Sequence, residues 1–209
     1  MKILSLLGEL SKFPLKKDNT IAFTACTKYI KHRTYLSNVA SRARPSALVD
    51  EIGIGLKLYG HEACVAWRNT LLAEHILPAL RPSALDRLEW HRERGDELVL
   101  ATATNEFLTQ PVASHLEIPH LIASPAARRG TDFTGERGGP ACFREEKLRY
   151  VESWLGARGH TLESVEAWFY SDSINDLPLL GAVHHPVVVA PDQKLAEIAT
   201  ANGWELIPS

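Results

Sequence analysis

Two aspartates, Asp172 and Asp176, stand four residues apart directly after the apolar run 168–170. In a doubly wound α/β domain, ligands bind at the carboxyl ends of the strands, near the point where the strand order reverses. Two carboxylates at such a place offer oxygen ligands to Mg²⁺, which keeps part of its water shell and commonly serves a phosphate group. The same spacing also suits a helix start, where Ser173 and Asp176 would form a capping box.

A second candidate lies at the end of the apolar stretch 98–101, where Thr102 is followed by a predicted helix that begins near Asn105. A hydroxyl beside the free N–H groups of a helix start is an arrangement that binds anions. The alternative is that the polar residues here only cap the helix and stabilise the fold.

A third candidate is Lys147, in the run Phe143-Arg-Glu-Glu-Lys147. A lysine ammonium places a point positive charge on a phosphate. The alternative is a solvated helix face on which glutamates pair with the lysine.

Strands and helices alternate from residue 82 onward, and these elements must position the three motifs. We expect helices over 82–94, 105–116, 144–158 and 192–201, and strands over 97–101, 120–123, 165–170, 186–190 and 204–207. Such alternation predicts an α/β fold, a mostly parallel sheet with helices on both faces. Residues 131–136 suggest a hairpin, and residues 46–80 read as helices.

Taken together and in this order, the three motifs resemble the haloacid dehalogenase (HAD) superfamily, and more narrowly its phosphoserine-phosphatase-like IB subfamily. The resemblance covers about residues 74–209. It is carried by Ala101-Thr-Ala-Thr-Asn-Glu-Phe-Leu, by Gly139-Pro-Ala-Cys-Phe-Arg-Glu-Glu-Lys and by Tyr170-Ser-Asp-Ser-Ile-Asn-Asp-Leu-Pro. It implies a Rossmann-like doubly wound parallel sheet with a helical cap inserted after the first strand. The core would be residues 1–19 and 81–209, and the cap residues 20–80.

The resemblance also implies roles for individual residues in Mg²⁺-dependent hydrolysis of a small phosphomonoester. Thr102 and Lys147 would hold the phosphate, and Asp172 would bind the metal, with Asp176 supporting the metal site. The residues beside the substrate would be Thr104 and Asn105.

The chain departs from the family at its first motif, an Asp-x-Asp-x-Thr sequence whose first aspartate attacks phosphorus. One register follows a predicted strand that begins at Ile3, and it puts Leu7, Glu9 and Ser11 at the three key positions. The other puts Lys16 at the nucleophile and Asp18 at the acid/base. The first register follows the better strand. Neither supplies a carboxylate nucleophile, which the covalent route requires.

Composition bounds the remaining possibilities. The 209 residues carry a net charge of −2, which gives no general attraction to nucleic acid or membrane. Three widely spaced cysteines indicate no disulfide framework, so we expect a reducing, cytoplasmic setting. We also expect the protein to be a monomer or a homodimer. Residues 1–45 are distinct, with nine basic and two acidic residues. Two hypotheses remain: a phosphatase with an altered first motif, or an inactive relative that binds a phosphorylated ligand or a partner protein.

Overall fold

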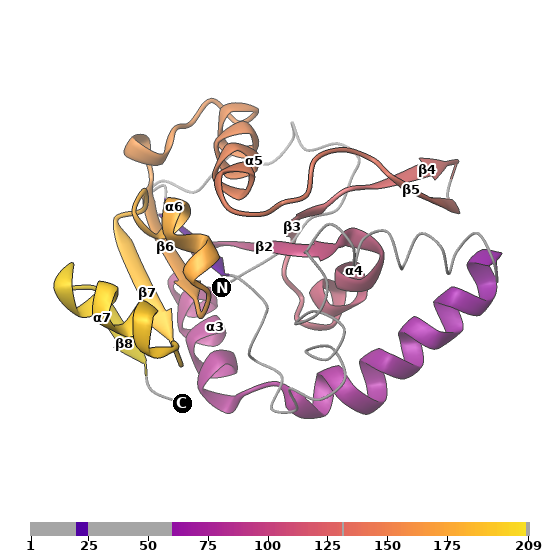
Figure 1. Ribbon diagram of the computed structural model, residues 1–209, viewed down its shortest axis with the longest axis horizontal. Coiled ribbons are helices and arrows are strands. Elements are labelled where there is room, and N and C mark those ends of the chain that lie inside the picture. The colour runs from indigo at the N-terminus through magenta and orange to yellow at the C-terminus, as the bar shows by residue number, and fades with distance from the viewer. Residues whose placement is uncertain (1–19, 25–59, 131, 208–209) are drawn as a thin grey trace.

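The computed structural model describes residues 20–24, 60–130 and 132–207 (Figure 1). The fold is built on one parallel sheet. Its six strands lie in the order β3-β2-β1-β6-β7-β8, and every neighbouring pair is parallel. The strands are β1 (Thr20–Thr24), β2 (Glu97–Asn105), β3 (His120–Ser124), β6 (Glu166–Ser171), β7 (His185–Val189) and β8 (Glu205–Ile207).

The strand order reverses at β1. From β1 the chain builds outward through β2 to β3, and then returns to the other side of β1 to add β6, β7 and β8. The register pairs Thr24 with Leu100 on one side of β1 and Thr20 with Glu166 on the other. Because all six strands are parallel, the carboxyl ends of β2, β1 and β6 meet at one edge, which is where a doubly wound sheet binds ligands.

Helices cover both faces of the sheet because side chains alternate along each strand. Val99 and Ala101 of β2 pack in one core cluster, with residues of α5, α6 and α7. Leu98 and Leu100 pack in the other, with residues of α3 and α4. The helices are α3 (Pro82–Arg94), α4 (Glu106–His115), α5 (Glu145–Gly156), α6 (Leu177–Leu180) and α7 (Gln193–Ala201). Gly95 ends α3 with φ of 74°, a left-handed conformation in which glycine carries no side-chain penalty.

A helical segment and a hairpin pack beside this core. Residues 60–71 are α-helical and continue into a π-helical turn, Leu72–Ile76, and a 3₁₀ turn, Leu77–Ala79. The hairpin consists of β4 (Ala126–Arg129) and β5 (Asp132–Arg137). His61 of the helical segment stacks on Phe133 of the hairpin, with ring centroids 6.1 Å apart, and Phe107 of α4 meets the same Phe133 ring edge-on at 5.1 Å.

The predicted fold class is confirmed, and the strands expected after residue 96 form within a few residues of the expected bounds. The first strand requires a correction. The expected strand from Ile3 lies outside the described residues, whereas Thr20–Thr24, which we placed in the cap, pairs inside the core sheet. Thr, Ile and Phe favour strands, but the polar sequence around them obscured that preference. Residues 25–59 of the expected cap also lie outside the described part. Among the described residues, no helix is long and apolar enough to cross a membrane.

Candidate active site

Thr102 lies near the carboxyl end of β2 and is almost completely buried, with 2% of its surface exposed. Its Oγ1 accepts a hydrogen bond from the backbone N–H of Thr104, at 3.1 Å. Asn105 begins the next helix as its N-cap, and its Oδ1 accepts from the N–H of Phe107 at 2.8 Å. The Asn105 side chain is therefore committed to capping α4, while Thr104 is partly exposed beside it.

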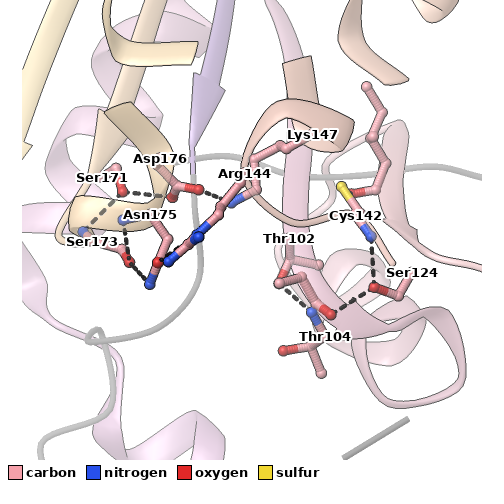
Figure 2. Close-up of polar contacts among 12 residues, drawn as sticks. Thr102, Thr104, Ser124, Cys142, Arg144, Lys147, Ser171, Ser173, Asn175 and Asp176 are labelled. Atoms are coloured by element: carbon pink, nitrogen blue, oxygen red, sulfur yellow. Dashed lines mark hydrogen bonds and ion pairs between the residues drawn. The ribbon is translucent and has the colours of Figure 1, made fainter. Parts of the chain in front are cut away.

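Ser124, at the end of β3, ties this turn to the loop that precedes α5. Its hydroxyl donates to the carbonyl of Ala103 at 2.7 Å and accepts from the N–H of Cys142 at 2.9 Å (Figure 2). Cys142 is fully buried, and burial raises the pKa of its thiol to about 12. Lys147 opposes this rise in pKa and Asp176 adds to it, so Cys142 lies within electrostatic reach of both charged groups.

Lys147 is a buried cation that points from α5 toward the end of β6. Its Nζ donates to Oδ1 of Asp176 at 2.5 Å, and the two side chains are only 4% and 3% exposed. The other carboxylate oxygen, Oδ2, accepts from the hydroxyl of Ser171 at 2.7 Å. Asp176 therefore uses both oxygens to hold Lys147 and Ser171 in place. A buried lysine held in this way can present its remaining N–H groups to an anion.

Asp172 follows β6 directly and is 7% exposed, so it is a second buried carboxylate at the carboxyl edge of the sheet. The described residues contain no group of three or more His, Cys, Asp or Glu side chains that could hold a metal ion. Asp176 already holds Lys147 and Ser171, so the donor set rests on Asp172, and Mg²⁺ commonly uses one or two carboxylates together with water and a substrate phosphate. The residues present thus fit a weak Mg²⁺ site, in which Asp172 is the candidate ligand.

Arg144 connects the start of α5 to the turn after β6. Its Nε donates to the side-chain Oδ1 of Asn175 at 3.2 Å, and the backbone N–H of Asn175 donates to Ser173 Oγ at 3.3 Å (Figure 2). Arg144 has φ of 53° and ψ of −124°, a conformation that L-residues rarely adopt. Such strain persists only where surrounding contacts impose it, and it clusters at functional sites.

The structure thus gathers Thr102, Lys147, Asp172 and Asp176 at one edge of the sheet, with Thr104 and Asn105 beside them. Sequence reasoning missed four residues that organise this edge: Ser124, Arg144, Ser171 and Asn175. Two of them carried a readable signal, because Ser124 and Ser171 are polar residues that end apolar strands. The other two gave none, since their contacts join segments that are distant in sequence.

The sequence-based candidates for the first motif come from residues 7–18. Leu7, Glu9, Ser11, Lys16 and Asp18 all lie outside the described residues. β1 begins at Thr20, two positions after Asp18 in the sequence, and the site lies at the carboxyl ends of the strands. The strand that occupies the place of the family's first strand ends at Thr24. No Asp or Glu occurs between Asp18 and Asp50 in the sequence.

The family model of the haloacid dehalogenase-like hydrolases matches residues 22–181 of this chain. A histidinol-phosphatase from Neisseria meningitidis serogroup C (strain 8013) is 36% identical over 155 residues, which cover 73% of this chain and 69% of that protein. The phosphoserine phosphatase SerB1 of Mycobacterium tuberculosis (strain ATCC 25618 / H37Rv) is 31% identical over 142 residues, 68% of this chain. The chain spans 46% of the length of this second relative.

Solved structures agree with this fold. A protein of unknown function from Bordetella pertussis Tohama I superposes with a TM-score of 0.80 at 30% identity, over 91% of this chain and 99% of that one. A phospho-aspartyl intermediate analogue of phosphoserine phosphatase superposes with a TM-score of 0.56 at 14% identity, over 92% of this chain and 94% of that one. At that identity the second likeness supports the fold alone.

Proposed function

Since the chain belongs to the haloacid dehalogenase-like hydrolase family, we propose that it is a Mg²⁺-dependent phosphatase-type protein acting on a small phosphorylated metabolite. The observation that carries the proposal is the buried Lys147, held by Asp176 at the edge where β2 and β6 end. A cation is costly to bury unless it is paired and hydrogen-bonded. One with remaining donors toward a ligand edge is suited to a phosphate.

In this proposal each residue at the edge has a distinct task. Lys147 supplies positive charge to the phosphate. Thr102 supplies a hydroxyl, and the start of α4 nearby supplies backbone N–H groups. Asp176 orients Lys147 through the 2.5 Å contact. Asp172 would hold Mg²⁺, which neutralises phosphate charge when it is bound. Thr104 and Asn105 would line the substrate side, with Asn105 fixing the direction of α4 through its cap.

The names of two relatives support a substrate class for this proposal. The names of the two relatives denote phosphatases for histidinol phosphate and phosphoserine, both small amino-alcohol phosphates. We propose a substrate of this type for this chain. Cytoplasmic placement and a monomeric or homodimeric state remain part of the proposal.

A second candidate, phosphate binding without turnover, is favoured by the sequence that follows β1. Catalysis through an aspartyl-phosphate needs a carboxylate in line with phosphorus. The segment from Asn19 to Val49 contains none. In this candidate the Lys147 side of the site is kept for recognition of a phosphorylated ligand, while the nucleophile is missing.

Turnover and binding measurements on the full chain separate the two candidates. Hydrolysis of phosphoserine, histidinol phosphate and p-nitrophenyl phosphate would be followed with and without Mg²⁺, and calorimetry would measure inorganic phosphate binding. Mg²⁺-dependent turnover that disappears in Lys147→Ala supports the phosphatase. Binding without turnover, weakened in the same variant, supports the second candidate. If the native chain neither binds phosphate nor hydrolyses any ester, both proposals fail.

A further inference from the structure

A groove of about 750 Å³ runs along the outer edge of the sheet, beside β3. Consecutive β3 residues, 120–123, form its floor, one face of α5 forms one wall, and the base of the β4–β5 hairpin forms the other. Within the described part of the chain, β3 pairs with β2 alone, so none of the described strands covers its other side. Figure 1 shows α5 and the hairpin on either side of β3.

The groove is distinct from the phosphate site, although α5 contributes to both. Lys147 and Val151 point into the core and the candidate active site. Tyr150 and Trp154, four residues apart on α5, line the groove, and Arg158 in the turn after the helix lines it too. Residues four apart lie on one helix face, so α5 presents different faces to the two places.

Arginines stand at both ends of this largely apolar groove. At the amino end of β3, the ring centroids of Trp154 and His120 lie 5.2 Å apart. The Arg158 guanidinium lies 3.9 Å from the centroid of the Trp154 ring. At the carboxyl end stand Arg128 and Arg137, on the two strands of the hairpin. Among the described residues that line the groove, the acidic one is Glu106, which pairs with Arg128 at 3.5 Å. Glu97, outside the lining, pairs with His120 and lies within electrostatic reach of Arg158. The lining therefore carries a positive balance.

We propose that this groove binds an extended peptide segment of a partner protein, which adds to β3 as a further strand and carries acidic side chains at both ends. An open edge offers backbone N–H and C=O groups to an incoming strand, and pockets beside it select the side chains. Five residues of β3 span roughly 17 Å at about 3.3 Å per residue, which sets the length of the bound segment. The apolar floor suits apolar residues between the two acidic ends, whose carboxylates meet Arg158 at one end and Arg128 and Arg137 at the other.

Charge placement argues for a foreign acidic segment over a second copy of this chain. In a two-fold pairing of β3 with itself, the strands run antiparallel and the same patch meets itself. The Arg128 and Arg137 end of one copy would then face the Arg158 end of the other. Juxtaposed like charges disfavour such a pairing, whereas an acidic segment complements both ends.

The test uses the full chain and a fluorescein-labelled probe peptide with glutamate at each end and Val-Thr-Val between them. Fluorescence anisotropy should report saturable binding. Arg158→Glu and Arg128→Glu should each weaken binding about tenfold, because each removes a charge-assisted contact. Arg149→Glu is the matched control. Arg149 lies on α5, its side chain is 69% exposed, and it does not line the groove. Circular dichroism melts confirm that the variants fold.

A second probe separates strand addition from simple attraction of an anion. N-methylation of alternate peptide nitrogens removes donors from one edge of the probe and leaves its charges unchanged. We expect the N-methylated probe to bind about tenfold more weakly than the parent when the blocked donors are those that face β3. If the probes methylated on one edge and on the other bind equally well, strand addition is ruled out. If Arg149→Glu weakens binding as much as Arg158→Glu and Arg128→Glu do, the groove is ruled out as the binding site. Absence of binding below about 1 mM, or a native dimer that Trp154→Glu dissociates, overturns the proposal as well.

Discussion

At the scale of single residues, Lys147 and Asp176 are the pair on which both stability and phosphate recognition depend. Each is almost fully buried and each satisfies the other. Removing one partner of such a pair leaves a buried charge uncompensated, which typically costs about 3–5 kcal/mol. Removing both in favour of apolar residues of similar volume is often neutral.

Lys147→Ala should therefore lower the free energy of unfolding by about 3 kcal/mol, because the Asp176 carboxylate loses its cation. The double variant Lys147→Met, Asp176→Leu should recover most of that loss but bind no phosphate. Urea denaturation followed by circular dichroism measures the first effect, and phosphate calorimetry the second. Lys194→Ala, at an exposed position on α7, is the control and should change stability by less than about 0.5 kcal/mol. Phosphate binding that survives in the double variant would contradict the role of Lys147.

In the proposed site, Asp172 binds the metal rather than the phosphate. We expect the native chain to bind Mg²⁺ weakly, since few carboxylates are available, and Asp172→Asn to abolish that binding. Calorimetry with Mg²⁺ alone provides a readout that does not depend on turnover. Glu145→Gln, an exposed acid in the first turn of α5, serves as the matched control. Equal Mg²⁺ affinity in the native chain and in Asp172→Asn would remove Asp172 from the metal site.

At the scale of elements, the end of β1 determines whether the site can be completed. β1 ends at Thr24 between β2 and β6, at the edge where the other site residues gather. We propose that the family's first motif corresponds to the residues at the end of β1, which puts its three key positions at Thr24, Cys26 and Lys28 of the sequence. None of these residue types carries a carboxylate, so in this register the usual nucleophile is missing.

Restoring the motif at this position should create or raise activity. The triple variant Thr24→Asp, Cys26→Asp, Lys28→Thr should increase Mg²⁺-dependent hydrolysis of p-nitrophenyl phosphate, because it places a carboxylate near the phosphate-binding residues. The matched control carries the same three residue types at the earlier register, as Leu7→Asp, Glu9→Asp and Ser11→Thr, and should remain at the native level. A gain in the control alone would reverse the assignment of the first strand.

The same element shows what the sequence could and could not predict. The strands after residue 96 were predictable because apolar runs there are bounded by Gly, Pro and polar residues. β1 was missed because its position is fixed by pairing with β2 and β6, and such non-local contacts override local composition. The site divides in the same way. Thr102, Lys147 and Asp172 were predicted from motifs, whereas the contact of Arg144 with Asn175 exists only once α5 and β6 are packed together.

At the scale of the whole molecule, the buried network on the face opposite α5 links pH to stability. Tyr170 is 2% exposed, its hydroxyl lies 2.8 Å from His91 Nε2, and His91 Nδ1 lies 2.7 Å from Asp96. Burial raises the pKa of Tyr170 from the usual 10.0 to about 12. The folded state thus retains the phenolic proton at pH values where the unfolded chain releases it.

A raised pKa in the folded state contributes stability that is complete below pH 10 and is lost as the pH rises toward 12. Between these values the native chain should lose stability faster than Tyr170→Phe, by up to about 1.4 kcal/mol per pH unit. Urea unfolding at several alkaline pH values measures the two slopes. The Phe variant is less stable at neutral pH, so only the slopes are compared, and identical slopes would rule out Tyr170 as the titrating group.

The central place of β1 also governs the order in which the molecule can be assembled during synthesis. β1 meets β2 about 75 residues later in the chain, but its other neighbour begins at Glu166, which pairs with Thr20. A nascent chain that has not yet produced β6 therefore carries β1 with one side unpaired, and unpaired strand edges recruit other chains. We therefore expect ribosome-bound intermediates in this window to be prone to aggregation through this strand edge.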